Sequence, residues 1–294
     1  MADSQKQTVQ WFPGHMAKTR RLIKEGLSSV DAVVELLDAR IPMSSRNPEI
    51  EQLTASKPHI ILLNKADIAD DKTTKLWINY FKGEKQRALA VDCRSGKGLG
   101  IFSDVVKDVL KERIEANEQR GMAGKPLRLM IVGIPNTGKS SFINRMAGKT
   151  KAKVADKPGV TRQNQWFAIG NGLELLDTPG VLWPKFDDAE VGDKLAFIGS
   201  VKDEILDSET IACRLIDVLA RDYTQLLTQR YKLTQADIDE AENSYELLEL
   251  IGRKRGMLIR GGEVDTQRAS CALLDEYRAG KLGKLSLEKP PKAE

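Results

Sequence analysis

Apolar residues in the first half of the chain fall into short, nearly continuous runs that alternate with amphipathic stretches. The runs at 32–39, 59–64 and 87–93 are apolar almost throughout, which is typical of parallel strands covered on both faces. This alternation indicates a doubly wound, mostly parallel α/β sheet. The amphipathic stretches predict four helices, the last of them long, at 14–27, 47–56, 71–82 and 99–118.

The next part of the chain adds further strands to this pattern. A polar connector, residues 119–126, is followed by an apolar strand at 127–133. Two more apolar runs, at 165–170 and 173–180, flank Asn171-Gly172. This dipeptide is a strong signal for a tight hairpin turn, so we predict that the last two strands pair as a hairpin.

From about residue 187 onwards the apolar spacing is helical, and no clear strand follows. We therefore predict an α/β domain at 1–186, in which 1–25 form an N-terminal extension, and a smaller all-α domain at 187–284. The last residues, 285–294, combine charged residues with prolines and predict a disordered tail.

The composition is typical of a soluble globular protein, with 41% hydrophobic and 30% charged residues among 294. No apolar run approaches the ~18 residues of a membrane span, and the N-terminal segment lacks the apolar region of a signal peptide. Cys93, Cys213 and Cys271 are far apart and form no CxxC pair, which argues against a disulfide framework or a zinc site. These features favour a cytoplasmic protein.

The net charge of +4 is unevenly distributed along the chain. Residues 128–162 carry eight basic residues and one acidic residue, and residues 250–284 carry eight basic and four acidic residues. The segment between them, 170–210, carries ten acidic and three basic residues. Basic clusters of this kind favour a polyanionic partner such as RNA, although a solvated surface of mixed charge explains any single cluster equally well.

One motif carries phosphate chemistry. Residues 133–140, Gly-Ile-Pro-Asn-Thr-Gly-Lys-Ser, match the phosphate-loop pattern GxxxxGK[ST] in full, between a predicted strand and a helix-like segment. The glycines let backbone N–H groups converge on phosphate oxygens, and the dipole of the following helix adds positive charge. We expect Lys139 to reach the β- and γ-phosphates as a catalytic group, and Ser140 to bind Mg²⁺. The predicted nucleotide contacts here are Asn136, Thr137, Gly138, Lys139, Ser140 and Ser141.

A second motif supplies the remaining groups around the metal ion. An apolar strand ends in Asp177-Thr-Pro-Gly180, where Asp177 is expected to hold Mg²⁺ through water and the Gly180 N–H to meet the γ-phosphate. Between the two motifs, Thr161 is placed to close over Mg²⁺ and the γ-phosphate, as a switch that the triphosphate orders. We therefore group Thr161 with the catalytic residues and, beside Ser140 and Asp177, with the metal ligands.

The tetrapeptide Asn64-Lys65-Ala66-Asp67 follows an apolar strand and predicts the base. Asp67 can accept two hydrogen bonds, from guanine N1–H and from the 2-amino group, whereas adenine has no donor at either position. Asn64 can connect the base region to the phosphate loop, and the stem of Lys65 can cover the purine face. These residues predict guanine rather than adenine.

A further predicted strand end is a candidate for the small loop whose backbone N–H reads guanine O6. Asp92, Cys93 and Arg94 stand there in place of the usual Ser-Ala-Lys, a loose match that backbone recognition tolerates. A small buried hydrophobic residue is an equally good interpretation of Cys93. At another strand end, Asp38 and Arg40 either face the site or form an ordinary surface ion pair.

The order of these motifs is unusual, because the base tetrapeptide precedes the phosphate loop instead of following it. The set is complete, and one rotation of the chain restores the usual order. Strand ends still converge on one nucleotide if the strands keep their spatial neighbours, and chain termini are often close enough to be joined. We therefore predict a circularly permuted, Ras-like P-loop GTPase domain, with residues 119–126 as the join.

The chain resembles the ribosome biogenesis GTPase A (YlqF/RbgA) family of circularly permuted GTPases, bacterial factors for late assembly of the large ribosomal subunit. The resemblance covers nearly the whole chain and rests on "QWFPGHMAK", "LLDARIPMSSRNP", "LLNKAD", "GIPNTGKSS", "KPGVTRQ", "LLDTPGVLWPKF" and "GRKRGMLIRGGEVD". It implies a helical C-terminal RNA-binding domain, binding to a 50S precursor, and GTP hydrolysis stimulated by the ribosome. We also expect a monomer.

The sequence offers two candidates for the groups that promote hydrolysis. Many GTPases place a Gln directly after the DxxG motif to orient the attacking water, but Val181 stands there. The resemblance implies His15 as the catalytic residue that positions water, and a contact residue on a mobile N-terminus is the alternative. Asn136 resembles the asparagine of potassium-activated GTPases, which implies K⁺ beside the phosphates. His59 opens a strand and is expected to be structural.

Two classes of function fit these observations. One is a GTP-hydrolysing assembly factor that uses the GTP cycle to control its association with rRNA, and its release. The other is a mainly structural RNA-binding protein for which GTP is only a conformational ligand. A GTPase that acts on another RNA is disfavoured by the resemblance. The residues expected to contact rRNA phosphates are Arg253, Lys254, Arg255 and Arg260, with Lys18, Arg20 and Arg21 as an additional surface.

Overall fold

The structure is a computed structural model that describes residues 13–148, 165–180, 182–183, 188–201 and 207–291, with the backbone alone for residues 13–16. The chain divides into two compact units. The first unit contains the described residues up to Trp183 together with 286–291, and the second contains the described residues from Asp188 to Leu285. No described helix is both long and apolar enough to cross a membrane.

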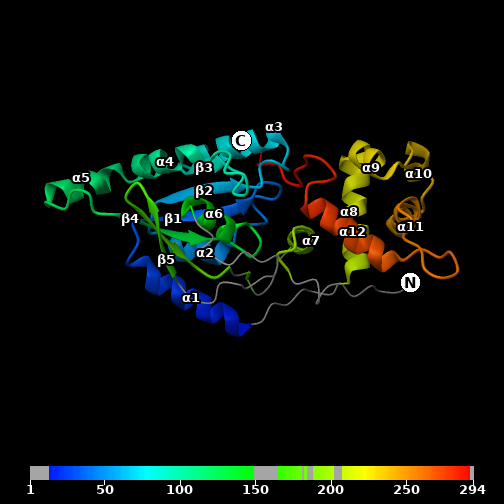
Figure 1. The fold of residues 1–294 in the computed structure, drawn as a ribbon, viewed down its shortest axis with the longest axis horizontal. Coiled ribbons are helices and arrows are strands. Elements are labelled where there is room, and N and C mark those ends of the chain that lie inside the picture. The colour runs from blue at the N-terminus through cyan, green and yellow to red at the C-terminus, as the bar shows by residue number, and fades with distance from the viewer. Residues whose placement is uncertain (1–12, 149–164, 181, 184–187, 202–206, 292–294) are drawn as a thin grey trace. The chain divides into compact units, whose positions relative to one another are not determined.

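The first unit is built around a six-stranded sheet with the strand order β3-β2-β1-β4-β6-β5 (Figure 1). Its strands are β1 (Ala32–Asp38), β2 (His59–Asn64), β3 (Arg87–Ala90), β4 (Leu127–Val132), β5 (Gln165–Gly170) and β6 (Leu173–Asp177). All neighbouring pairs are parallel except β5 with β6. In the turn between these two, Asn171 and Gly172 both have positive φ, 51° and 74°, as a type I′ turn requires. The predicted α/β sheet and its hairpin are therefore confirmed.

Helices cover both faces of this sheet. One face packs against α4 (Phe102–Val109) and α6 (Lys139–Met146) through a single apolar cluster. The other face packs against α1 (Pro13–Leu27), α2 (Pro48–Thr54) and α3 (Asp71–Gly83) through two clusters. Because successive residues of a strand point to opposite faces, β1 contributes to all three clusters and is buried along its whole length.

The single long helix predicted at 99–118 is wrong. The segment forms a 3₁₀ turn, η1 (Leu99–Ile101), followed by α4 and then by α5 (Lys111–Gln119), with a break at Leu110. α4 is amphipathic and buries its apolar side against the sheet, whereas α5 is almost entirely polar. The break lies where the apolar face ends, because helices in proteins are held mainly by the packing of that face.

The second unit is helical. Its central helix is α8, which contacts α7, α9, α11 and α12. Of the six helices formed by the described residues of this unit, five start at a side-chain cap, in which an Asp, Asn or Thr oxygen accepts a backbone N–H of the first turn. The helices are α7 (Ala189–Phe197), α8 (Ser208–Asp222), α9 (Thr224–Tyr231), α10 (Gln235–Asp239), α11 (Ser244–Lys254) and α12 (Thr266–Arg278).

The disordered tail predicted for 285–294 is wrong for the described residues 285–291. Leu285 and Ser286 are buried, and the backbone N–H of Leu287 donates to the carbonyl oxygen of Arg40 at 2.8 Å. The composition of this segment is typical of disorder. Hydrogen bonds from residues 286–288 to a distant part of the chain nevertheless hold this segment against the rest of the first unit, and composition alone does not reveal such partners.

A largely buried carboxylate connects three helices of the second unit. Glu276 on α12 accepts hydrogen bonds from Arg230 Nε (2.9 Å) and from the Tyr231 hydroxyl (2.9 Å), and it forms an ion pair with Arg255. Burial raises the pKa of Glu276, but the hydrogen bonds and the two guanidinium charges outweigh it, so the pKa lies below the ordinary value of 4.5. The ionised form is therefore the one that stabilises the unit.

Glu276→Gln should loosen α9, α11 and α12. The variant loses the negative charge that pairs with Arg230 and Arg255. This loss should lower the free energy of opening these helices by about 2 kcal/mol, which corresponds to roughly 30-fold faster amide hydrogen exchange at about pH 7. Because the pKa is lowered in the folded state, this stabilisation is present above about pH 4.5 and is lost as the pH falls through the folded value.

Hydrogen–deuterium exchange of the full chain measures the effect helix by helix. Glu240→Gln, an exposed change in the same unit, is the matched control and should exchange like the wild type. A difference between Glu276→Gln and wild type that is equally large at about pH 7 and about pH 3.5 would contradict the assigned role of the charge.

Candidate nucleotide-binding site

Parallel pairing delivers the predicted site residues to one end of the sheet. Asp38 at the end of β1 lies beside Asn64 at the end of β2, and Ile131 of β4 lies beside Asp177 at the end of β6. The phosphate loop follows β4 directly. Carboxyl ends of parallel strands are where open α/β sheets bind ligands. The motifs of the phosphate, the metal ion and the base therefore meet despite their order in the chain.

Glycines shape the phosphate loop between β4 and α6. Gly133 has φ +148°, and a Cβ there would lie 2.6 Å from the carbonyl oxygen of Leu36. Gly138 has φ +99°, and a Cβ there would collide with the side-chain amide of Asn64. Both positions therefore exclude a side chain through backbone conformation and through lack of space. Asn136, within the loop, also adopts a left-handed conformation, with φ +62°.

The side chain of Asn64 joins the phosphate loop to the base-reading segments. Its amide nitrogen donates to the carbonyl oxygen of Thr137 at 2.7 Å, and its amide oxygen accepts the N–H of Cys93 at 3.0 Å. Asn64 is only 3% exposed, so these contacts satisfy its amide inside the protein. One residue of the tetrapeptide thus fixes the phosphate loop relative to the loop after β3.

Lys139, the first residue of α6, is buried within the phosphate loop. Its ammonium group donates to the carbonyl oxygens of Gly133 (3.0 Å) and Ile134 (2.7 Å). Burial lowers the pKa of Lys139 to about 8, and the nearby charge of Asp177 opposes this shift. Phosphate oxygens would be stronger partners for the ammonium group than the two carbonyl oxygens, because hydrogen bonds between charged groups are the stronger ones.

The Asp-Thr-Pro-Gly turn lies against the phosphate loop. Asp177 is buried at the end of β6, and the Thr178 hydroxyl donates to the carbonyl oxygen of Ile131 at 2.6 Å, which fixes the start of the turn. A Cβ on Gly180 would lie 2.6 Å from Lys139 Nζ. The turn therefore approaches the lysine that is expected to contact the phosphates, and a side chain at residue 180 would force the lysine ammonium group to move.

The oxygen donors at this end of the sheet suit Mg²⁺. Ser140 offers a hydroxyl and Asp177 a carboxylate, and both are hard oxygen ligands of the kind that Mg²⁺ prefers. Among the described residues, no group of three or more His, Cys, Asp or Glu side chains could hold a metal ion. Ser140 and Asp177 fit an ion that is shared between protein oxygens and phosphate oxygens, as Mg²⁺ is in phosphoryl-transfer sites.

Asp38 and Arg40 form a fully buried ion pair beside the tetrapeptide, so the surface pair that the sequence allowed is excluded. Arg40 donates to the Asp38 carboxylate through Nε (2.9 Å) and through a terminal nitrogen (2.8 Å), and Lys65 Nζ lies 3.0 Å from the same carboxylate. Burial raises the pKa of Asp38, but the charges of Arg40 and Lys65 outweigh it and hold the pKa well below its usual range. Asp38, at the end of β1, thus orients Lys65 of the tetrapeptide. The sequence had left the role of this strand end open.

The rest of the tetrapeptide forms a loop whose last residue is exposed. The N–H of Ala66 donates to the carbonyl oxygen of Val91 at 3.1 Å, which attaches the loop to the chain that follows β3. Asp67 is exposed at the tip. Its carboxylate is therefore accessible to a ligand from solvent, as recognition of a base requires.

The loop after β3 is shaped by Asp92. Its carboxylate accepts the N–H groups of Arg94 (2.8 Å) and Ser95 (3.2 Å), and these bonds outweigh burial, so the pKa of Asp92 is lowered. Cys93 is buried in the apolar cluster of the sheet, and burial raises the pKa of its thiol. The side chain of Cys93 is therefore a small buried hydrophobic group, while its backbone N–H binds Asn64.

Several predicted residues are not covered. Thr161 and Val181 lie outside the described residues, and the structure gives only the backbone of His15, which is part of α1. Ser141 is described and lies half-buried in the first turn of α6, directly after Ser140.

The loop predicted to contact RNA is a short hairpin between α11 and α12. Leu258 pairs with Val264, and the N–H of Ile259 donates to the carbonyl oxygen of Glu263 at 2.9 Å. Leu258 and Ile259 are 46% and 48% exposed, which is unusual for large apolar side chains.

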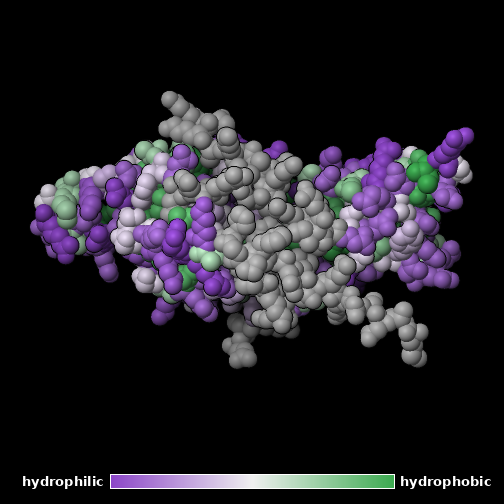
Figure 2. All heavy atoms as spheres, turned by 90° about the horizontal axis from the view of Figure 1, so that it is seen from below, coloured by the Kyte–Doolittle hydropathy of each residue, from purple (hydrophilic) through white to green (hydrophobic). Residues whose placement is uncertain are grey.

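The molecular surface is mainly hydrophilic on the face drawn in Figure 2. In the parts of this face that are not drawn in grey, apolar residues occupy only small areas.

The four basic residues of this region are not equivalent. All four are exposed. Arg255 differs in that it is paired with Glu276 and lies over the ring of Tyr231, 5.8 Å from its centroid. Part of its charge is therefore compensated within the unit, whereas no ion pair is described for Arg253, Lys254 or Arg260.

The additional basic surface predicted on α1 is mostly paired as well. Arg20 forms an ion pair with Glu49, and Arg21 forms one with Glu25. Lys18 is exposed. Surface pairs of this kind contribute little free energy, so both arginines remain accessible to a stronger anion.

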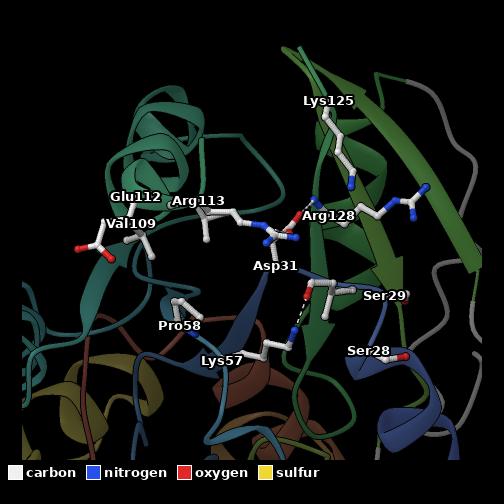
Figure 3. A pocket seen from close by; sticks show the side chains of 12 residues that line it. Ser28, Ser29, Asp31, Lys57, Pro58, Val109, Glu112, Arg113, Lys125 and Arg128 are labelled. Atoms are coloured by element: carbon white, nitrogen blue, oxygen red, sulfur yellow. Dashed lines mark hydrogen bonds and ion pairs between the residues drawn. The ribbon is translucent and has the colours of Figure 1, made fainter. Parts of the chain in front are cut away.

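A cavity of about 440 Å³ lies at the opposite, amino end of the sheet (Figure 3). Residues that precede β1, β2 and β4, among them Asp31, Lys57 and Lys125, line it. Asp31 accepts hydrogen bonds from Arg113 Nε (3.2 Å) and from the Arg128 N–H (2.9 Å), and Figure 3 shows Arg113 reaching towards Asp31. The cavity is therefore separate from the nucleotide motifs that the structure describes, which lie at the carboxyl ends of the strands.

Comparisons with known proteins give one consistent result. A family model described as "50S ribosome-binding GTPase" matches residues 128–249. Ribosome biogenesis GTPase A of Bacillus cereus is 44% identical over 96% of this chain and 94% of its own length. The protein of the same name from Priestia megaterium is 47% identical over 98% of this chain and 99% of its own length.

Solved structures extend the similarity to both units. The structure titled GNP-bound YlqF from T. maritima matches with a TM-score of 0.65 at 32% identity, over 94% of this chain and 100% of that chain. A GDP-bound structure titled TM YlqF matches with a TM-score of 0.64 at 33% identity, over 91% of this chain and 98% of that chain. The order of the motifs in the chain is therefore shared with these proteins rather than peculiar to it.

Asn64→Ala should weaken the binding of a guanine nucleotide. The substitution leaves the carbonyl oxygen of Thr137 and the N–H of Cys93 without their partner, which corresponds to roughly a 10- to 100-fold loss of affinity. The loss of affinity should be similar for GDP and GTP, because the hydrogen bonds of Asn64 hold two loops in place and do not involve the γ-phosphate. Titration with fluorescent nucleotides measures it, and Asn79→Ala, an exposed asparagine on α3, is the control. Wild-type affinity in Asn64→Ala would contradict the bridging role.

Proposed function

Because the chain belongs to the ribosome biogenesis GTPase A family of circularly permuted GTPases, we propose that it binds and hydrolyses GTP during assembly of the large (50S) ribosomal subunit. The observation that carries the proposal is the hydrogen bond from Asn64 to Thr137, 73 residues apart in the chain. It joins a guanine-type tetrapeptide to a phosphate loop that follows it. The protein acts as a cytoplasmic monomer in this proposal.

Guanine is selected by the loops after β2 and β3. Asp67 accepts the N1–H and 2-amino hydrogen bonds, and the stem of Lys65 covers the purine face. The backbone of Ala66, Asp92 and Cys93 forms the rest of the base site. Support comes from the exposure of Asp67 and from the Asn64–Cys93 hydrogen bond, which places the two loops together. A carboxylate in this position rejects adenine, because its oxygens would face a lone pair.

The phosphates are bound by the loop after β4. Backbone N–H groups of residues 136–141 surround the phosphate oxygens, and Lys139 contributes its positive charge as the γ-phosphate is transferred. We assign Ser140, Asp177 and Thr161 as the residues that hold Mg²⁺, which neutralises phosphate charge when bound. The N–H of Gly180 meets the γ-phosphate, so the Asp-Thr-Pro-Gly turn responds to the loss of that group.

RNA is bound through the hairpin between α11 and α12. Arg253, Lys254 and Arg260 are exposed at its base and tip and contact phosphates of the precursor rRNA. Arg255 contributes by holding the hairpin to Glu276. Association and release are then controlled by the nucleotide, because hydrolysis changes the turn at Gly180 just before the helical unit begins.

GTP turnover should be slow for the isolated protein and stimulated by large ribosomal subunits. With Val181 after the DxxG motif, no side chain at that position orients water, and we assign this task to His15. His15→Ala should lower the stimulated rate by about 100-fold while GTP affinity is retained. Phosphate release with and without 50S subunits measures this.

The second histidine provides the matched control for this measurement. His59 lies at the start of β2 with Nε2 3.0 Å from the carbonyl oxygen of Thr54, so His59→Gln should retain stimulated turnover. Unchanged stimulated turnover in His15→Ala removes His15 from the mechanism. No stimulation in the wild type would favour a structural RNA-binding protein that uses GTP as a conformational ligand.

Turnover should be faster in KCl than in NaCl at matched ionic strength. We assign Asn136 as a K⁺ ligand beside the phosphates, where the ion would add positive charge in the manner of an arginine finger. Asn136→Ala should then turn over GTP equally slowly in both salts. Equal rates for the wild type in KCl and NaCl would rule out the potassium site.

A further inference from the structure

The segment that follows the helical unit in the chain returns to the first unit. Ser286 is buried, and its hydroxyl oxygen accepts the N–H of Asp70 at 3.1 Å. The N–H of Leu287 donates to the carbonyl oxygen of Arg40 at 2.8 Å. These contacts connect residues more than two hundred positions apart, so they exist only in the folded protein.

Glu288 makes the largest set of contacts in this segment. Its carboxylate accepts the N–H of Met43 at 2.8 Å, the N–H of Ser44 at 3.2 Å and the hydroxyl of Ser44. Its carbonyl oxygen accepts the indole N–H of Trp77 at 3.2 Å. A carboxylate that accepts several backbone and hydroxyl donors holds a loop firmly, because each such bond to a charged group is stronger than a neutral one.

All of these partners belong to two loops or to α3, the helix that follows the second loop. Arg40, Met43 and Ser44 lie in the loop after β1, whereas Asp70 caps α3 directly after the base-reading tetrapeptide. The two loops are also joined to each other, because the N–H of Ala39 donates to the carbonyl oxygen of Asn64 at 2.8 Å. The segment therefore spans both loops next to the base site.

The loop after β1 controls the orientation of Lys65. Asp38 holds Lys65 Nζ at 3.0 Å and is itself held by Arg40, whose carbonyl oxygen is the acceptor of Leu287. Lys65 has φ +61°, a strained conformation for a residue with a side chain, and such conformations persist only where the surroundings enforce them. Buried charges such as Asp38 and Arg40 likewise tolerate little displacement of their partners.

We propose that Ser286, Leu287 and Glu288, the C-terminal strap, position the guanine-reading loop. The strap holds the loop after β1 and the start of α3, so that Lys65 and Asp67 are presented to the base in one geometry. Its residues act on the base through these loops and are positioning residues. The inference rests on the base site proposed above, in which Asp67 binds guanine.

Inosine diphosphate distinguishes positioning from general stability. Inosine lacks the 2-amino group, so Asp67 can accept one hydrogen bond fewer from it than from guanine. A displaced Asp67 weakens both bonds to guanine but only one to inosine. Loss of the strap should therefore lower the affinity for GDP more than that for IDP, and narrow the GDP-over-IDP preference by roughly tenfold.

Two variants test the strap in the otherwise complete chain. Glu288→Gln keeps the size of the side chain and weakens its hold on the loop after β1. A chain that ends at Leu285 removes the strap altogether. Lys289→Gln, an exposed change in the same segment, is the matched control and should bind GDP and IDP as the wild type does. Dissociation constants for GDP and IDP are measured together with the melting temperature.

The expected result is a narrowed GDP-over-IDP ratio, modest in Glu288→Gln and larger in the truncated chain. If both variants keep the wild-type ratio, or lose affinity for GDP and IDP equally, the strap has no positioning role. Asp67→Asn tests the base site separately, because an amide at this position should lower the affinity for GDP and raise the affinity for xanthosine diphosphate. Wild-type GDP binding in Asp67→Asn would refute the base site. If Asp67→Asn instead shows the expected preference for xanthosine diphosphate and the strap variants keep the wild-type GDP-over-IDP ratio, only the role of the strap is refuted.

Discussion

The site depends on the parallel pairing of β2, β1, β4 and β6. This pairing places four strand ends side by side, and each end is followed by a loop that carries one part of the chemistry. Which strand comes first in the chain does not matter to that geometry. A rotated order is therefore compatible with a complete nucleotide site, as long as the hydrogen bonds between neighbouring strands are unchanged.

Asn64 shows how closely the rotated parts are fitted. Its amide nitrogen and oxygen bind two loops that the chain separates by η1, α4, α5, the connector at 119–126 and β4. The same amide occupies the space that a Cβ at residue 138 would need, so Gly138 is required by the base tetrapeptide as well as by phosphate binding. A substitution in either motif therefore disturbs the other, even though the two motifs read different parts of the nucleotide.

The sequence predicted those features that depend on local patterns. Apolar runs revealed the strands, Asn171-Gly172 revealed the hairpin, and the resemblance of the whole chain to one family is confirmed by relatives of similar length. Features that depend on distant partners were missed. Leu110 breaks a helix where packing on the sheet ends, and Arg255 pairs with Glu276. Of the two interpretations left open for Asp38 and Arg40, the surface ion pair is excluded, because the pair is fully buried. No local pattern reports such contacts, because each needs the folded neighbour to be known.

The end of the chain is the clearest case of a distant partner overriding composition. "SLEKPPKAE" lacks the apolar content that usually orders a segment, yet Glu288 reaches a loop 245 residues away. The permuted order of the motifs in the chain makes this contact important for the helical unit. The helical unit now lies in the chain between Gly180, beside Lys139, and Ser286, beside the guanine-reading loop. Its two connections in the chain therefore lead to the turn beside the phosphate loop and to the loop after β2, so the rotated order ties the helical unit to both motifs.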